Sequence, residues 1–138
     1  MDMAAGPLAR ACGLGNDIDA AADEIERTRR FPPVLLDKLH DARLCRMLLP
    51  RSFDGDEVDP GAYFLTLEAV ARHDASVAWN LFTANSAALL AAHLEPETAR
   101  TVYGPRDAVV SWGPPNATVA TIEAGGYRVS GRWNFASG

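Results

Sequence analysis

The sequence changes its periodicity once, near Gly104, and this change constrains the fold more than any other feature. Before Gly104, apolar residues recur every three or four positions, which is the spacing of one face of an α-helix. After it, β-branched and aromatic residues predominate, and six of the eleven glycines lie from Gly104 onward. The sequence therefore predicts an all-α helical domain at residues 1–104, followed by a β segment at residues 105–138.

Helix starts in the first part are marked by capping residues and prolines. Asn16 or Asp17 can cap the first helix, Asp59–Pro60 opens a later one, and Asp74 can cap the one after it. These signals predict about five helices, over residues 17–30, 33–43, 60–73 and 76–93 and a short one from 95 to before 104.

The helix expected at residues 76–93 is apolar on nearly all sides, which places it in the centre of a helical bundle. A membrane span is not expected there, because the segment contains polar residues such as Asn80 and Asn85. The N-terminal residues also lack the unbroken apolar core of a signal peptide.

The β segment predicts short strands at residues 108–112, 118–123, 127–131 and 132–137. Gly125–Gly126 is typical of a hairpin turn. A sheet of three or four such strands has open edges. We therefore expect the beginning of a β domain that is not finished.

Charge and cysteine content exclude several classes of function. The net charge is −5 and the isoelectric point is about 5.1, so no basic field exists to hold nucleic acid. Cys12 and Cys45 form no CxxC pair, and neither a zinc site nor a disulfide scaffold is expected. We expect a reducing, cytoplasmic location, no metal, and no contact with membranes.

Three segments carry a resemblance to a known family. They are GGYRVSGRWNFASG at residues 125–138, ARLCRMLLP at 42–50 and ARHDASVAW at 71–79. In this order they resemble the acyl-CoA dehydrogenase superfamily, most closely its flavin-dependent monooxygenase branch. The resemblance covers residues 14–138. It implies that the chain holds the N-terminal helical domain and the first strands of an incomplete, truncated β-barrel domain that binds flavin.

The resemblance implies an oxidoreductase that uses FMN or FAD. Monooxygenases of this branch take reduced flavin from a separate flavin reductase and react it with oxygen to oxygenate a small organic substrate. An acyl-CoA dehydrogenase proper is one alternative, and a truncated, non-catalytic interaction module is another. The 138-residue chain alone is expected to be inactive, and we name no catalytic residue. The open sheet edge is a candidate surface for homo-oligomers.

Cofactor-binding residues are implied at two places in the β segment. The loop containing Trp112 and Gly113 occupies the position where dehydrogenases carry a Thr-Glu-Pro signature, which this chain lacks. The second place is the last strand, where Phe135 matches an aromatic position against the flavin ring and Ser137 matches a hydroxyl near its N5 and O4 edge. Trp133 is a further candidate. For both aromatic residues the alternative is a place in the barrel core.

Substrate-binding residues are implied on the apolar helix, which runs beside the substrate pocket in the family. Trp79 and Asn85 are the candidates. For Asn85 the alternative is a buried amide that satisfies backbone groups. His73 beside Asp74 is either a pair of base and orienting acid or, as the alternative, a helix junction capped by Asp74.

Overall fold

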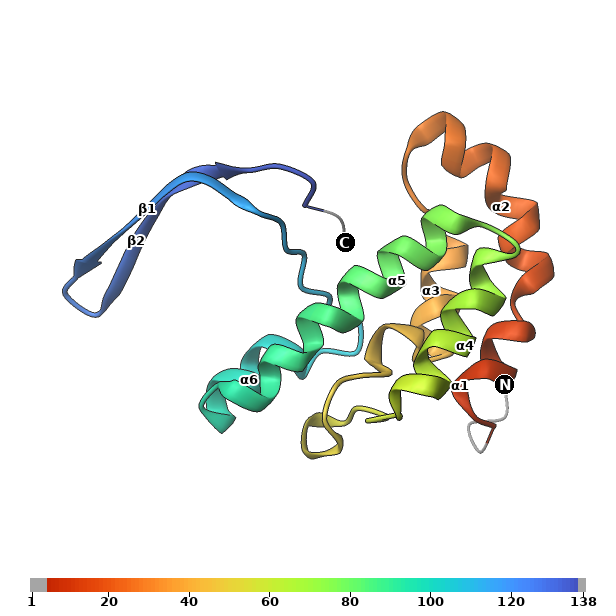
Figure 1. Ribbon diagram of the computed structural model, residues 1–138, viewed down its shortest axis with the longest axis horizontal. Helices are drawn as coiled ribbons and strands as arrows, with labels where there is room; N and C mark the ends of the chain where they lie inside the picture. The colour runs from red at the N-terminus through yellow and green to blue at the C-terminus, as the bar shows by residue number, and fades with distance from the viewer. Residues whose placement is uncertain (1–4, 137–138) are drawn as a thin grey trace.

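The computed structural model describes residues 5–136 and shows a helical body followed by one β-hairpin (Figure 1). Ser137, a predicted flavin contact, lies outside the described residues. The helices are α1 (Pro7–Cys12), α2 (Gly15–Thr28), α3 (Pro33–Asp41), α4 (Pro60–Ala71), α5 (Ala75–Ala88) and α6 (Pro96–Tyr103). Short 3₁₀ turns η1 (Leu44–Arg46), η2 (Arg51–Phe53) and η3 (Leu89–His93) connect them.

The predicted caps of the two central helices are confirmed, whereas the cap predicted at Asn16 or Asp17 was wrong, because α2 begins at Gly15 without a side-chain cap. The Asp59 side chain accepts a hydrogen bond from the Ala62 N–H at the start of α4. At the start of α5, Asp74 accepts from the backbone N–H groups of Ser76 and Val77. These bonds satisfy donors that the first helical turn leaves open. They fix where the two longest apolar segments begin.

Helix α1 was not expected. Its six residues stand among Gly6, Gly13 and Gly15, and so short a segment has little helical stability of its own. Packing against α4 and an ion pair from Arg10 to Asp56 compensate for this. The tertiary contacts therefore decide the conformation here.

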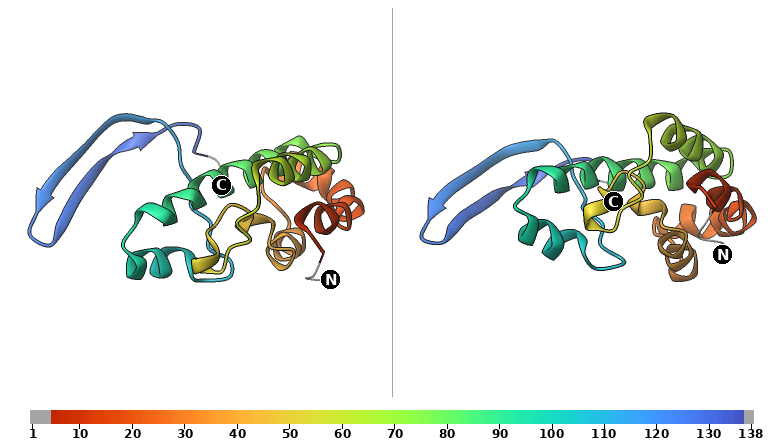
Figure 2. Two further views of the ribbon diagram at one scale, coloured as in Figure 1. Left: turned by 60° about the horizontal axis from the view of Figure 1, so that its bottom comes forward. Right: turned by 90° about the horizontal axis from the view of Figure 1, so that it is seen from below.

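One main core lies among α1 to α5, and Figure 2 shows the arrangement of these helices from two further directions. Ile18 of α2, Leu39 of α3 and Val77 of α5 are fully buried in it. A second, smaller cluster joins Leu49, Ala88 and Tyr103, and the Tyr103 hydroxyl donates to the Ala87 carbonyl at 2.8 Å. No described helix is both long enough and apolar enough to cross a membrane.

Two strands, rather than the expected four, make up the β segment. β1 (Pro115–Glu123) pairs antiparallel with β2 (Gly126–Trp133). The turn between them uses Gly125 with a φ of 87°, which confirms the hairpin. The prediction of a strand at 108–112 was wrong, because that segment forms only an isolated bridge at Trp112. The predicted boundary between one strand ending at Gly131 and another beginning at Arg132 was also wrong. β2 runs through Gly131 without interruption, opposite a bulge in β1.

The hairpin has one apolar face and one polar face. Its register pairs Ile122 with Tyr127 and Ala120 with Val129 on one side. On the other side, Arg128 forms an ion pair with Glu123 at 2.8 Å. Ile122 and Tyr127 are more than two-thirds exposed, and the hairpin projects away from the helical body (Figure 1).

Candidate functional site

The structure brings together the two segments for which flavin contact is predicted. Gly113, in the loop before β1, lies directly against the backbone that follows β2. A Cβ at position 113 would lie 2.6 Å from the carbonyl oxygen of Asn134 and 3.0 Å from the nitrogen of Ala136. Only a residue without a side chain allows this approach. The loop and the strand end therefore form one surface at the base of the hairpin.

Three aromatic side chains are presented on and beside this surface. Phe135 is 90% exposed, Trp112 is 49% exposed and Trp133 is 44% exposed. Phe135 also has a φ of 55°, in the left-handed region that aromatic residues rarely occupy. Strain of this kind is often kept at binding sites. None of the three aromatic side chains is buried in a core in the structure.

These residues fit a flat, conjugated cofactor such as flavin. An exposed aromatic ring offers a face on which a planar ring system can stack. The bare backbone at Gly113 allows a ligand to approach main-chain donors and acceptors closely. The chemistry that flavin supplies when bound is electron transfer, and the protein's part is to hold and orient the ring.

The two predicted substrate-binding residues of α5 have different surroundings. Trp79 is 58% exposed and packs against the Phe82 ring, with the ring centroids 5.6 Å apart. Asn85 is fully buried. Its Oδ1 accepts from the Leu48 N–H at 3.1 Å, and its Nδ2 donates to the carbonyls of Leu44 and Leu81 at 2.8 Å each. The observed task of Asn85 is to hold α5 against the segment 44–48.

His73 and Asp74 do not act as a pair. His73 Nδ1 lies 2.9 Å from a carboxylate oxygen of Asp19 on α2, whereas Asp74 caps α5. Hydrogen bonds from Ser76 and Val77 hold the pKa of the Asp74 carboxyl below its usual value, against the effect of burial, which alone would raise it. The capping alternative is therefore the one observed.

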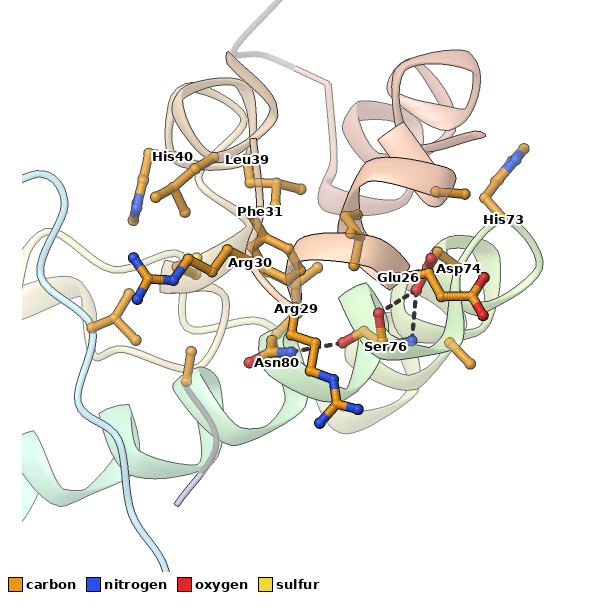
Figure 3. A pocket seen from close by; sticks show the side chains of 18 of the residues that line it. Glu26, Arg29, Arg30, Phe31, Leu39, His40, His73, Asp74, Ser76 and Asn80 are labelled. Atoms are coloured by element: carbon orange, nitrogen blue, oxygen red, sulfur yellow. Dashed lines mark hydrogen bonds between the residues drawn. The ribbon is translucent and has the colours of Figure 1, made fainter. Parts of the chain in front are cut away.

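A cavity of about 1090 Å³ lies between α2, α3 and α5, and sequence analysis missed it. It is open to solvent on one side and is lined by the end of α2, helix α3, the first half of α5 and residues 107–109 (Figure 3). Ile25, Leu39 and Leu81 supply apolar wall, and Arg29, Arg30 and His40 supply nitrogen atoms. Its lining comes from four segments far apart in the sequence, so no local pattern indicates it. The one sequence signal is the Arg29–Arg30 pair directly after a helix.

Among the described residues, no group of three or more histidine, cysteine or acidic side chains is arranged to hold a metal ion. The chemistry available at the base of the hairpin is thus stacking and hydrogen bonding. At the cavity it is charge pairing and apolar contact.

A helical body that leads through an extended linker into an antiparallel hairpin defines the class of protein. The class is an α-then-β fold, in which a helical domain is followed by antiparallel strands. The family "Acyl-CoA dehydrogenase, N-terminal domain" matches residues 14–102, and the chain belongs to this family.

Two characterised relatives are similar over most of the chain. The indole-3-acetate monooxygenase of Pseudomonas putida is 33% identical over 139 residues, covering 99% of this chain and 35% of the relative. The indole-3-acetate monooxygenase of Acinetobacter baumannii is 33% identical over 123 residues, covering 86% of this chain and 31% of the relative. The chain thus spans about a third of the length of the relatives it matches.

Solved structures with the same fold include two bacterial proteins. "XiaF from Streptomyces sp. in complex with FADH2 and Glycerol" superposes with a TM-score of 0.89 at 23% identity, covering 96% of this chain and 34% of that one. The HsaA monooxygenase from M. tuberculosis superposes with a TM-score of 0.85 at 23% identity, covering 95% and 35%. These similarities extend through the hairpin as well as the helices, so the fold of both parts is shared.

Proposed function

We propose that this chain is the N-terminal part of a flavin-dependent monooxygenase that oxygenates a small organic substrate. The observation that carries the proposal is the 33% identity to an indole-3-acetate monooxygenase over 99% of the chain. The fold shared with a structure that contains reduced flavin supports it. The helical domain would end near residue 104 and the flavin-binding β domain would begin at 105.

The flavin site would be the surface at the base of the hairpin. Phe135 stacks on the ring, Trp112 and Trp133 flank it, and Gly113 keeps the loop close to the strand end. Ser137 donates a hydrogen bond to the polar edge of the ring. The exposed aromatic side chains and the close approach at Gly113 support the roles of these residues, whereas the role of Ser137 rests on the family resemblance.

The substrate would meet α5 at Trp79, whose indole is exposed. Asn85 would act from inside the core, since its hydrogen bonds fix the position of the helix that carries Trp79. We place the protein in the cytoplasm with a separate flavin reductase as partner. Homo-oligomers would form through the open edge of the hairpin.

The absence of a Thr-Glu-Pro signature argues against an acyl-CoA dehydrogenase. Residues 111–114 are Ser-Trp-Gly-Pro instead. The two relatives that are 33% identical to this chain are both monooxygenases by name. The monooxygenase is therefore the function we propose.

A titration of the 138-residue chain with FMN and FAD, oxidised and then reduced without oxygen, tests the flavin site. Flavin fluorescence reports the oxidised form and ultrafiltration reports both. We expect saturable binding that weakens about tenfold in Phe135→Ala and in Ser137→Ala. Phe64→Ala, a change at an exposed aromatic on α4, is the matched control and should bind like the unchanged chain. Equal binding by all four proteins, or none by any, would overturn the proposed site.

A further inference from the structure

We propose that the cavity between α2, α3 and α5 is a binding site for a small organic acid with a planar apolar body. Its carboxylate would lie between Arg30 and His40. This inference rests on the cavity alone and does not depend on flavin binding at the hairpin. The cavity, at about 1090 Å³, is slightly larger than the range typical of small-molecule sites.

The inner wall of the cavity is apolar and already formed. Ile25 of α2, Leu39 of α3 and Leu81 of α5 are each at least nine-tenths buried and belong to the main core. Phe31 is half-buried beside them and offers an aromatic surface. A flat apolar body would bury surface against these side chains without requiring the core to rearrange.

A buried nitrogen without a partner points to a ligand at one end. His40 is 6% exposed and lines the cavity, and within residues 5–136 its Nδ1 has no hydrogen-bond partner. Such a group normally has one, because an unsatisfied buried polar atom costs free energy. Burial, with help from Arg106, lowers the pKa of His40, so the ring is neutral at physiological pH. A neutral imidazole with its proton on Nδ1 donates to a carboxylate oxygen.

Cationic groups surround this end of the cavity. Figure 3 shows the Arg30 side chain reaching toward the end where His40 lies, with Arg29 further along. In the part of the chain that the structure describes, neither guanidinium has an ion-pair partner. Arg106 and Arg46 add positive potential at His40, partly offset by Asp107 and Asp37. A guanidinium binds a carboxylate through two parallel hydrogen bonds.

The acidic groups of the cavity lie mostly elsewhere or are already engaged. Glu26 and Asp74 are at the opposite end from His40 in Figure 3. Asp74 is occupied by the cap of α5 and Asp23 is exposed to solvent, whereas Asp107 is exposed near His40 and partly offsets the arginines there. An anionic group is favoured at the Arg30 end, and the apolar body extends along the wall.

The test compares two probes that share one planar ring system and differ in their head group, which is charged in one and neutral in the other. Calorimetric titration of the 138-residue chain with 2-naphthoate and with the neutral 2-naphthamide measures both dissociation constants. We expect naphthoate to bind at least tenfold more tightly. Arg30→Gln and His40→Leu should each reduce naphthoate affinity about tenfold and leave naphthamide nearly unchanged. Arg27→Gln, a change on α2 outside the cavity lining, is the matched control.

Thermal unfolding checks that each variant folds, and His40→Gln replaces His40→Leu if the latter does not. Equal affinity for the two probes would overturn the inference, and so would an Arg30→Gln variant that binds naphthoate like the unchanged chain. The absence of binding by either probe would also overturn it. None of these outcomes bears on the flavin titration, which tests residues at the base of the hairpin.

Discussion

Gly113 lies so close to Asn134 that a Cβ on it would stand 2.6 Å from the Asn134 carbonyl oxygen. This distance is below any normal contact, so Gly113→Ala must push the loop away from the end of β2. The atom it meets is backbone, which yields less easily than a flexible side chain. We expect changed amide resonances in ¹H–¹⁵N spectra at residues 111–113 and 133–136, and none in α2 to α4.

Gly126→Ala is the matched control for this change. Gly126 also lies in the β segment, but a Cβ there meets nothing within 4 Å. Its resonance changes should stay at the hairpin turn. If Gly113→Ala left residues 133–136 undisturbed, the shared surface at the base of the hairpin would not exist as described.

Asn85 holds α5 in place, and Asn85→Leu should destabilise the fold. The substitution removes three hydrogen bonds in a fully buried position and leaves the Leu48 N–H without its acceptor. Unsatisfied buried groups cost about 1–3 kcal/mol each. We expect the free energy of unfolding in urea to fall by about 2–4 kcal/mol. We also expect the far-UV circular dichroism of the folded state to stay the same.

Asn80→Leu is the control on the same helix. Asn80 is only half-buried, and its amide makes a local bond to the Ser76 carbonyl at 2.9 Å. Its replacement should change the free energy of unfolding by less than about 0.5 kcal/mol. If the free energy of unfolding fell by similar amounts in the two variants, the buried hydrogen bonds of Asn85 would contribute no more to stability than the local bond of Asn80.

The sequence predicts the helical part well because its signals are local. Asp59 and Asp74 cap helices with their own side chains, and prolines set the first turns. Helix α1 escapes prediction because its stability comes from α4 and from Asp56, far along the chain. The strand count fails for a related reason. Gly131 resembles a turn residue by type, yet it lies inside β2 where the strand passes close to Thr118.

The sequence likewise predicts some residues of the candidate sites and not others. The aromatic residues at 112, 133 and 135 can be selected from the sequence by their resemblance to a family, and the contact at Gly113 then joins their two segments. Trp79 and Asn85 lie on one helix, six residues apart, but one faces solvent and the other the core. No spacing rule indicates the cavity, because its lining comes from α2, α3, α5 and the linker together.

Arg46 ties the linker that leads to the hairpin to the rest of the helical body. It is 4% exposed and donates hydrogen bonds to the carbonyls of Phe53, Asp54 and Pro105. Arg46→Met should lower the free energy of unfolding by about 2 kcal/mol. Arg46→Lys should restore little of it, because a single ammonium group cannot reach carbonyls spread over the planar fork of a guanidinium.

Arg51→Met is the control for Arg46. Arg51 is exposed on the neighbouring 3₁₀ turn. Its backbone N–H donates a hydrogen bond to the Glu57 side chain, whereas its guanidinium has no hydrogen-bond partner among the described residues. Chemical denaturation should show a change within about 0.5 kcal/mol. Full stability in Arg46→Lys would mean that charge alone, and not the three directed bonds, matters at position 46.

The two thiols should differ sharply in reactivity. Cys12 is exposed, whereas Cys45 is 9% exposed and burial raises its pKa to about 11. The thiolate is the reactive form, so at pH 8 Cys45 is inert in the folded protein. Titration with a chromogenic disulfide reagent should release about one equivalent of thiolate from the folded chain and a second one only in urea. Cys12→Ser should abolish the first equivalent and keep the second.

The raised pKa of Cys45 also makes the fold sensitive to alkali. The pKa of this thiol is about 11 in the folded state against 9.0 for an unperturbed cysteine, so the unfolded chain loses its proton first as the pH rises. The stabilisation is therefore complete below pH 9 and is lost between pH 9 and 11. It amounts to about 3 kcal/mol for two pKa units.

Burial likewise raises the pKa of Tyr63, to about 12, so part of the alkaline loss belongs to that residue. Cys45→Ala isolates the thiol: its free energy of unfolding should fall less between pH 8 and 11 than that of the unchanged chain. Parallel pH curves for the two proteins would show that Cys45 is not the titrating group.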